Sequence, residues 1–522
     1  MEALFSVTNL SVAFPEEKGL HTVVNDISFE MEPGQILGVV GESGSGKSMT
    51  ALAAMGLLKE DAQIMGGSIC LDGQEILQLD QKEHCRLRGC QMSMIFQEPM
   101  TSLNPVMKIG KQVGESLLLH KDSAISFDKE QIRTKVLESL REVGLTDAEK
   151  IYDQYPHELS GGMRQRVMIA QAMICEPKLL IADEPTTALD VVVQTQILNL
   201  LKELHQKKNI SILFISHDLN VIKELCTDVL VMYQGEIVER GPVRRVLEHP
   251  EHEYTKTLVA AIPNQNQPAQ REKTMLSLQD FSVFYTDKGP GIFGKKLRRQ
   301  VVKSVGVEIY EGEILGIVGE SGSGKSTFAK AIVGLNTDIE GNMSVDPSAN
   351  PQMVFQDPFG SLNPSRTIGW ILAEPLRLHG IRNKKERREL VCSMLQDVGL
   401  DESYYGRYPR ELSGGQRQRI SIAAALLMDS KLLVADEPVS ALDVTVQSQI
   451  LKLLLEIHAK RNLTMLFISH DLNIVRHICH RVAVMYEGEI VEMGTAEEVY
   501  NNPQHPYTKQ LLEASKLCLK IK

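Results

Sequence analysis

The eight-residue sequence GESGSGKS occurs twice in this chain, at residues 41–48 and at residues 319–326. Each copy follows a short apolar run, ILGVV or ILGIV, and precedes a segment of helical character. A strand, a glycine-rich loop and a helix in this order are the context in which G-x-x-x-x-G-K-[ST] binds a nucleoside triphosphate. Backbone N–H groups of the loop and of the helix N-terminus surround the anionic phosphate groups. We therefore expect two nucleotide sites in one polypeptide.

The side chains of these two loops have distinct expected roles. Lys47 and Lys325 are placed to lie over the β- and γ-phosphates, and Ser48 and Ser326 to give a hydroxyl ligand to Mg²⁺. The glycines allow the backbone to approach the phosphate oxygens closely. The expected phosphate-binding residues are the loop positions Gly41, Glu42, Ser43, Gly44, Ser45, Gly46, Lys47 and Ser48, with Gly319, Glu320, Ser321, Gly322, Ser323, Gly324, Lys325 and Ser326.

Two acidic residues end an apolar, strand-like segment in each half, within LLIADEP and LLVADEP. Asp183 and Asp436 are placed to hold Mg²⁺ through its water, while Glu184 and Glu437 can polarise the attacking water. The alternative is a pair of surface acids after a core strand. That alternative does not explain why the same pair recurs in register with the phosphate loop.

A histidine and a glutamine also end apolar segments in each half. His217 and His470 both stand 34 residues after the strand-end aspartate, which favours a γ-phosphate contact over a buried core histidine. We count them with Glu184 and Glu437 as catalytic candidates. Gln97 and Gln356 carry amides that can ligate Mg²⁺ or position water, so they join the serines and aspartates as magnesium candidates.

The whole chain is a tandem repeat. The phosphate loops are offset by 278 residues and the glutamines by 259, and every later motif is offset by 253, from LSGG to the H-x-Y-T-K segments near the two ends. The polar, proline-containing stretch AIPNQNQPAQREKT separates the halves and reads as a linker. We expect one domain at residues 1–262, a linker at 263–275 and a second domain at 276–522.

Composition excludes several classes of protein. A net charge of −11 and a sequence pI of about 5.8 argue against general binding to nucleic acid. The sequence contains no apolar stretch of 18 or more residues, so we expect no spanning helix in it. The eight cysteines are scattered without a C-x-x-C pair, which favours incidental thiols over a zinc or iron–sulfur site.

The segments LSGGMRQR and LSGGQRQR place a serine and two glycines at the start of a helix, which makes a second anion-binding helix N-terminus. Each half already has a phosphate loop, so this second site is expected to serve a nucleotide held by the other half. With these motifs the chain resembles the nucleotide-binding subunits of ABC transporters over nearly all of both halves. In that family ATP lies between the phosphate loop of one domain and the LSGG segment of its partner.

The resemblance implies an intramolecular dimer of cassettes with two composite sites. The first joins the loop, glutamine, acids and histidine of the first half to the second half's Ser413, Gly414 and Gly415. The second joins the corresponding residues of the second half to Ser160, Gly161 and Gly162. It also implies that Phe14 and Tyr285 stack on adenine, although an aromatic residue in a strand is often a core residue, and that Asp190 and Asp443 lie in a loop at the dimer contact. Neither half departs from the catalytic pattern, so both sites are expected to hydrolyse ATP.

Features outside the catalytic set narrow the resemblance. The segments EPMTSLNP and DPFGSLNP and the H-x-Y-T-K segments are similar to those of the oligopeptide/dipeptide/nickel branch of ABC importers. This branch implies uptake of peptides, glutathione, peptide antibiotics or nickel and other metal chelates, and the solute stays open. The implied fold is α/β: two tandem P-loop NTPase domains, each a RecA-like α/β core with an antiparallel β subdomain and an α-helical subdomain.

The implied cofactors are ATP and Mg²⁺. The implied partners are two integral membrane permease subunits and an extracytoplasmic solute-binding protein, with no nucleic acid. The implied location is peripheral, at the cytoplasmic face of the plasma (inner) membrane. Two alternatives remain: a twin-cassette protein that acts on ribosomes or DNA, and an ATPase that energises export. The short linker and acidic pI argue against the first, whereas the ATPase halves alone barely discriminate the direction of transport.

Overall fold

The computed structural model describes residues 3–16, 19–97, 102–120, 128–186, 191–259, 273–288, 296–440 and 442–517. The chain divides into two compact units, one formed mainly by residues 1–260 and the other mainly by residues 261–516. Most of the expected linker, residues 263–272, lies outside the described residues, and a strand already begins at Thr274.

The central sheet of the first unit has six strands in the order β10-β9-β3-β8-β7-β6. Its neighbours are parallel except for the β9–β10 hairpin. Every residue of β3, β7 and β8 is buried, because parallel strands in an α/β layer are covered on both faces. This explains the continuous apolar runs of the sequence. The strands are β3 (Ile36–Val40), β6 (Met92–Ile95), β7 (Leu179–Asp183), β8 (Ser211–Ile215), β9 (Asp228–Tyr233) and β10 (Glu236–Pro242).

A second, antiparallel sheet has the order β2-β1-β4-β5. Its strands are β1 (Phe5–Glu16), β2 (Gly19–Met31), β4 (Gln63–Leu71) and β5 (Gln74–Glu75). Phe5 and Ile69 of this sheet share one hydrophobic cluster with Leu37 of β3 and Ala51 of α1 (Lys47–Ala54). The helix that follows the phosphate loop is therefore fixed in the core between the two sheets.

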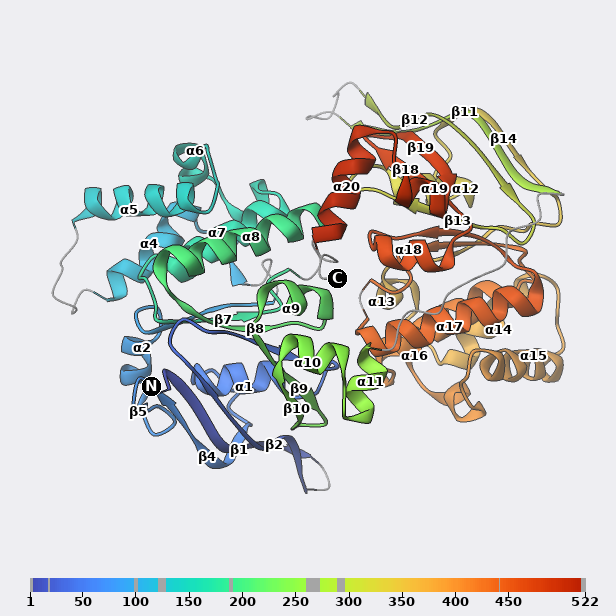
Figure 1. Cartoon of the computed structure of the whole chain (residues 1–522). Coiled ribbons are helices and arrows are strands. Elements are labelled where there is room, and N and C mark those ends of the chain that lie inside the picture. The colour runs from blue at the N-terminus through green and yellow to red at the C-terminus, as the bar shows by residue number, and fades with distance from the viewer. Residues whose placement is uncertain are drawn as a thin grey trace. The chain divides into compact units, whose positions relative to one another are not determined.

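Helices cover the rest of the first unit. Figure 1 shows α4, α5, α6 and α7 gathered together and set apart from the antiparallel strands β1, β2 and β4. Their core includes Val113, Val136 and Ile169, and it is continuous with the buried face of α8. The helices are α2 (Gln81–Leu87), α4 (Ile109–Leu119), α5 (Lys129–Glu142), α6 (Ala148–Asp153), α7 (Gly161–Met173), α8 (Val191–Lys208), α9 (Leu219–Leu225), α10 (Val243–Glu248) and α11 (Glu253–Val259).

The second unit repeats this plan, with a six-stranded sheet in the order β15-β16-β17-β13-β18-β19 and an antiparallel sheet in the order β12-β11-β14. Its strands are β11 (Thr274–Lys288), β12 (Lys296–Tyr310), β13 (Ile314–Val318), β14 (Ile339–Val345), β15 (Gln352–Val354), β16 (Leu432–Asp436), β17 (Thr464–Ile468), β18 (Arg481–Tyr486) and β19 (Glu489–Thr495). Its helices are α12 (Lys325–Ile332), α13 (Pro358–Ser361), α14 (Ile368–Leu378), α15 (Lys384–Asp397), α16 (Gly414–Leu426), α17 (Val444–Arg461), α18 (Leu472–Ile478), α19 (Ala496–Asn501) and α20 (Pro506–Leu517).

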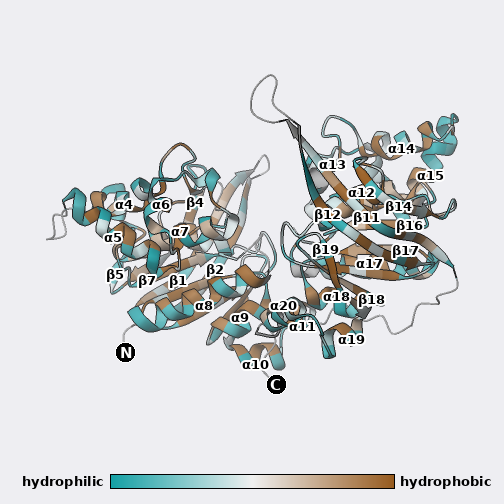
Figure 2. Cartoon of the chain, turned by 90° about the horizontal axis from the view of Figure 1, so that it is seen from above, coloured by the Kyte–Doolittle hydropathy of each residue, from teal (hydrophilic) through white to brown (hydrophobic). Residues whose placement is uncertain are grey.

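Hydropathy follows this layering. Figure 2 shows hydrophobic colouring along the central strands β16, β17 and β18, and mixed colouring along helices such as α8 and α9. Across the described ranges, none of the helices combines the length and the apolar character that crossing a bilayer requires. Each unit thus has the α/β core, the antiparallel sheet and the group of helices that the family resemblance implies.

Candidate functional site

The chemistry-bearing residues of the first unit follow the carboxyl ends of four neighbouring parallel strands. The phosphate loop follows β3, Gln97 comes shortly after β6, Asp183 ends β7, and His217 comes shortly after β8. Because these strands are parallel, their carboxyl ends meet at the same edge of the sheet, where α/β folds bind ligands. In the second unit β13, β15, β16 and β17 place the corresponding residues in the same way.

The phosphate-loop lysine is buried and held by its own loop. Lys47 Nζ donates to the carbonyl oxygens of Gly41 at 2.8 Å and Glu42 at 2.7 Å. Lys325 Nζ donates to Gly319 at 2.7 Å and Glu320 at 2.8 Å. Carbonyl groups of each loop therefore hold the ammonium group of its own lysine.

The first loop glycine is required by close approach. A Cβ atom on Gly41 would lie 2.1 Å from the carbonyl oxygen of Met232, and its φ of 156° is rare for other residues. Gly319 has the same geometry against Met485, at 2.1 Å. The loop therefore packs directly on the end of β9 or β18, and no side chain fits at this position.

A hydroxyl and a carboxylate meet at the start of α1 and α12. Ser48 Oγ donates to Asp183 Oδ1 at 3.0 Å, and Ser326 Oγ donates to Asp436 Oδ1 at 3.0 Å. Both are hard oxygen donors, and Mg²⁺ in nucleotide sites is held by one or two such protein groups together with phosphate oxygens and water. Across the described residues no group of three or more His, Cys, Asp or Glu side chains could hold a metal by itself. The donor set fits an ion that arrives with a nucleotide.

Burial shapes the electrostatics of this pair. Burial raises the pKa of Asp183 to about 6, the hydrogen bond from Ser48 opposes the rise, and the charge of Glu184 adds to it. The pKa of Asp436 is also raised, with burial as the largest cause. A divalent cation beside such a carboxylate would stabilise its anionic form.

Three polar side chains converge beside the aspartate in each unit. Gln97 Nε2 donates to Glu184 Oε2 at 3.0 Å, and His217 Nδ1 lies 3.1 Å from the same oxygen. In the second unit Gln356 Nε2 and His470 Nδ1 lie 2.8 Å and 3.2 Å from Glu437 Oε2. The glutamine and the histidine thus both fix the orientation of one carboxylate, the one that the sequence singles out as a base.

The glutamate in each triad makes its histidine partner easier to protonate. Burial lowers the pKa of His217, but the hydrogen bond and the charge of Glu184 outweigh burial and raise it above its ordinary value. The same balance raises the pKa of His470 beside Glu437. For Glu437, burial raises the pKa, but the contacts with His470, together with the charge of Lys325 and a hydrogen bond with Ser440, outweigh it, so the pKa is lowered.

Glu184 and Glu437 have left-handed backbone conformations, with φ of 47° and 46°. Each backbone N–H still pairs with the last residue of the adjacent strand, Ile215 or Ile468, at 2.9 Å and 3.0 Å. The chain therefore turns sharply at the residue that follows the strand. Backbone conformations of this kind in residues other than glycine cluster at functional sites, and no pattern in the sequence indicated this turn.

The LSGG segments form helix N-termini, as the sequence predicts. Ser160 caps α7 by accepting from the N–H of Met163 at 3.3 Å, and Ser413 caps α16 by accepting from the N–H of Gln416 at 3.4 Å. Gly161, Gly162, Gly414 and Gly415 form the first turns, whose N–H groups have no partner within a helix. These N–H groups suit an anion.

The remaining predicted residues lie in less decisive positions. Phe14 is half-buried in β1 against the core, and Tyr285 lies in β11 with 40% of its surface exposed. Adenine stacking by either ring stays a prediction. Asp443 caps α17, where it accepts from the N–H of Val446 at 3.0 Å, whereas Asp190 lies outside the described residues.

Sequence reasoning missed one contact to the phosphate loop. The H-x-Y-T-K segments served only as markers of resemblance, yet their tyrosines accept hydrogen bonds from the loops. The only sequence signal was their recurrence at the shared offset of 253 residues.

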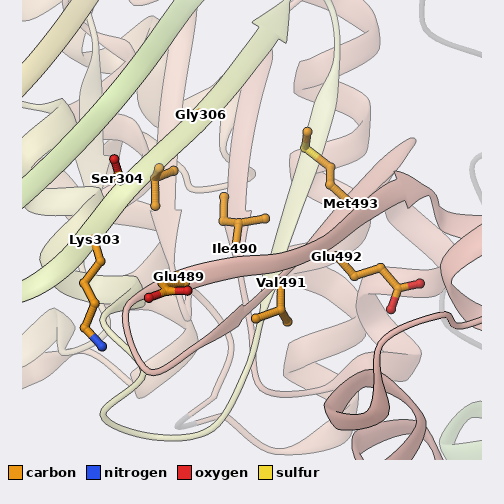
Figure 3. A pocket seen from close by; sticks show the side chains of 9 residues that line it. Lys303, Ser304, Gly306, Glu489, Ile490, Val491, Glu492 and Met493 are labelled. Carbon is orange, nitrogen blue, oxygen red and sulfur yellow. The ribbon is translucent and has the colours of Figure 1, made fainter.

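Two surface depressions accompany these sites. A groove of about 490 Å³ in the second unit lies between β12 and β19 (Figure 3), and its lining residues are not among the predicted site residues. A larger cleft of about 700 Å³ in the first unit is lined by apolar Met55, Leu57, Phe96 and Leu119 and by basic residues such as Arg86. Phe96 immediately precedes Gln97, so this cleft adjoins the triad.

Comparisons with known proteins show which family the chain is similar to. A family model described as ABC transporter matches residues 24–187 and again residues 302–440. One described as the C-terminal region of oligopeptide/dipeptide transporters matches residues 238–283 and 491–516. The glutathione import ATP-binding proteins GsiA of Escherichia coli O6:H1, Escherichia coli K12 and Salmonella typhimurium are each 41% identical, over 98% of this chain and 89% of the relative. A solved dimeric, post-hydrolysis ATP-binding cassette, MJ0796 with ADP and Pi, matches 46% of this chain and 99% of its own at 25% identity, with a TM-score of 0.42.

Proposed function

Because the chain belongs to the ATPase subunits of ABC importers of the oligopeptide/dipeptide type, we propose that it hydrolyses ATP at two composite sites. One site combines the phosphate loop of the first half with the LSGG segment of the second half, and the other combines the converse pair. The observation that carries this proposal is the duplication itself. Each half has a complete set of loop lysine, serine–aspartate pair and Gln–Glu–His triad, together with a capped LSGG helix.

The residues of each set divide the work of hydrolysis. Lys47 and the loop N–H groups bind the β- and γ-phosphates, and the LSGG N–H groups of the other half bind the same γ-phosphate from the opposite side. Glu184, oriented by Gln97 and His217, accepts a proton from the attacking water. Mg²⁺, held by Ser48 and Asp183, would supply positive charge on the phosphate oxygens. The second half repeats these roles.

We place the chain at the cytoplasmic face of the plasma membrane, bound to two permease subunits that receive solute from a binding protein outside. The cleft beside Gln97 is the surface we assign to a permease. Part of its apolar lining is exposed, with Phe96 at 38% and Leu119 at 75%. Exposed apolar residues rimmed by basic ones are typical of a surface that binds a protein segment.

For the solute we propose glutathione or another short peptide. The support is the similarity over nearly the full length of both proteins to relatives named for glutathione import. Identity at 41% favours this class of solute without fixing the compound.

Pairs of substitutions test the composite sites. Lys47→Ala and Ser413→Arg fall in one proposed site, whereas Lys47→Ala and Ser160→Arg fall in different sites of the same half. When two groups act in the same site, the effects of substituting them do not add. ATPase activity of the first pair should therefore be close to that of either single variant, and activity of the second pair should be much lower. The reverse pattern would show that each half works alone.

A transport assay tests the partner and the solute. The chain should be reconstituted in liposomes with the two permease subunits and the binding protein, and its ATPase activity measured with glutathione, other short peptides or nickel chelates. We expect stimulation by glutathione or short peptides, and its loss with Leu119→Asp. Val106→Asp, at a residue 82% exposed outside the cleft lining, is the matched control. Stimulation by nickel chelates alone would refute the peptide assignment.

A further inference from the structure

A tyrosine near the end of each cassette contacts the phosphate loop. The backbone N–H of Glu42 donates to Tyr254 Oη at 2.8 Å, across 212 residues of sequence. In the second unit the N–H of Glu320 donates to Tyr507 Oη at 2.9 Å. Both tyrosines are the third residue of an H-x-Y-T-K segment. The same contact thus forms independently in two units.

The contacted peptide unit is the one that holds the phosphate-loop lysine. The N–H of Glu42 and the carbonyl group of Gly41 belong to one planar peptide group. That carbonyl oxygen accepts from Lys47 Nζ at 2.8 Å. Tyr254 therefore holds one end of a rigid plane whose other end holds the lysine. In the second unit Gly319 and Lys325 complete the same arrangement, at 2.7 Å.

The tyrosine ring is itself fixed. Tyr254 is 8% exposed and stacks on Tyr233 of β9, with ring centroids 4.2 Å apart. Tyr507 is 6% exposed and packs on Tyr486 of β18 at the same centroid distance. Aromatic pairs at this separation contribute beyond the area they bury. The hydroxyl group is therefore presented to the loop by a rigid pair of rings.

The rest of the segment anchors the tyrosine to the sheet. Glu239 of β10 accepts from the N–H groups of Glu251 and His252, and His252 Nδ1 accepts from the N–H of Tyr254 at 3.2 Å. Glu492 of β19 accepts in the same way from Gln504 and His505, at 2.7 Å and 2.9 Å. Figure 3 shows the Glu492 carboxylate directed away from Lys303 and Glu489. The next residue, Thr255 or Thr508, is buried at 0% or 1% exposure.

We propose that Tyr254 and Tyr507 are positioning residues for ATP binding, which orient the first peptide group of each phosphate loop and so direct its lysine. The proposal deepens the proposed function, because it rests on the two loops as the phosphate sites. Removing the hydroxyl group leaves the N–H of Glu42 or Glu320 without that acceptor and frees the plane to rotate. Such a loss of one hydrogen bond weakens a dependent equilibrium by roughly three- to thirtyfold.

The test uses the full chain with one site silenced. In a Lys325→Ala background, ATP binding reports on the first loop, and Tyr254→Phe removes only the hydroxyl group while it keeps the stacked ring. The matched control is Tyr233→Phe, because this neighbouring hydroxyl group accepts from Gln234, a residue outside the loop. The mirror experiment uses Lys47→Ala with Tyr507→Phe.

Two readouts are needed: the equilibrium dissociation constant for ATP and amide hydrogen exchange of the peptide covering residues 41–48. We expect Tyr254→Phe to raise the dissociation constant roughly three- to thirtyfold and to speed exchange in this peptide. Exchange in α5 and α7 should be unchanged, which separates a local effect from general destabilisation. Tyr233→Phe should change neither readout.

Unchanged affinity and exchange in Tyr254→Phe would overturn the inference, and so would an equal effect of Tyr233→Phe, because the ring pair and not the hydroxyl group would then matter. A different result would contradict the proposed function. If Lys47→Ala with Lys325→Ala still bound ATP normally, the loops would not be the phosphate sites. The exchange measurement would still decide whether the tyrosine holds the loop.

Discussion

At the scale of single residues, the site is built around a carboxylate held from two sides. Gln97 and His217 both contact the same oxygen of Glu184, and the backbone of Glu184 is left-handed, with φ of 47°. Gln356, His470 and Glu437 repeat the arrangement. A side chain this constrained loses little freedom when it activates a water, which suits a general base.

The base assignment predicts the behaviour of the amide variants. Replacing Glu184 and Glu437 with Gln should lower ATP hydrolysis by roughly 10²- to 10⁴-fold, since an amide cannot accept the proton. ATP binding should persist, because the lysines and loops are unchanged, and ATP should remain trapped. Steady-state ATPase activity and retention of labelled ATP measure the two effects. Glu176→Gln is the control, since Glu176 also has a positive φ, of 54°, but pairs with Lys208 outside the site. Hydrolysis at the parental rate would exclude the assignment.

The raised pKa of His217 predicts that this residue stabilises the folded chain to an extent that depends on pH. The contacts with Glu184 raise the folded-state pKa of His217 despite the opposing effect of burial. The stabilisation is therefore complete below the unfolded pKa of about 6.5 and is lost as pH rises through the folded pKa. His217→Gln should lower the free energy of unfolding by about 1 kcal/mol at about pH 6 and by less at about pH 8.5. Urea unfolding of the nucleotide-free, EDTA-treated chain measures this. A larger loss at the higher pH would contradict the charge pairing.

At the scale of elements, the LSGG helix and the following helix meet at a glycine. A Cβ atom on Gly415 at the start of α16 would lie 2.3 Å from Val446 Cγ1 in α17, and one on Gly162 would lie 2.7 Å from Val193 Cγ1. The second glycine of LSGG therefore has a packing role in addition to its exposed N–H group. It lets the helix N-terminus lie against the first turn of its neighbour.

This packing predicts a rescue. Gly415→Ala should lower the free energy of unfolding by about 1–3 kcal/mol because the added carbon overlaps Val446. Gly414→Ala should lower the free energy of unfolding much less, since its Cβ atom would lie 3.3 Å from Leu442. Adding Val446→Ala to Gly415→Ala removes the overlapping methyl group and should recover part of the stability. Denaturant unfolding of the three variants measures the pattern. Equal effects of the two glycine substitutions would argue against the packing role.

The elements that sequence analysis located are those with a simple pattern. Strands β3, β7 and β8 read as apolar runs because both of their faces are buried, and the acids and histidines follow at their ends. Two features had no local signal. The left-handed turn occurs at Glu184, and glutamate has no preference for that backbone conformation. The hydrogen bond from Glu42 to Tyr254 spans 212 residues. Pairing between distant residues depends on the assembled sheet, which local patterns do not encode.

At the scale of the whole molecule, duplication in one chain has a thermodynamic consequence. Two sites that each need both halves would require two separate cassettes to meet at every turnover. A covalent connection between the halves replaces that encounter with an effective concentration of roughly millimolar. This advantage exists only if the sites are shared, so it distinguishes composite sites from two independent ATPases.

Cutting the connection therefore predicts a dependence on dilution. A protease site placed within residues 263–272, the part of the expected linker that precedes β11, would allow the two halves to be separated after purification. The specific ATPase activity of the cut chain should fall on dilution, because half-to-half association then follows the bulk concentration instead of the roughly millimolar effective value. The same chain left uncut should keep a constant specific activity over the whole range. Adding an excess of either half to the diluted, cut protein should restore activity. Constant activity of the cut chain at concentrations where sedimentation shows the halves to be apart would mean that each cassette hydrolyses ATP without the other.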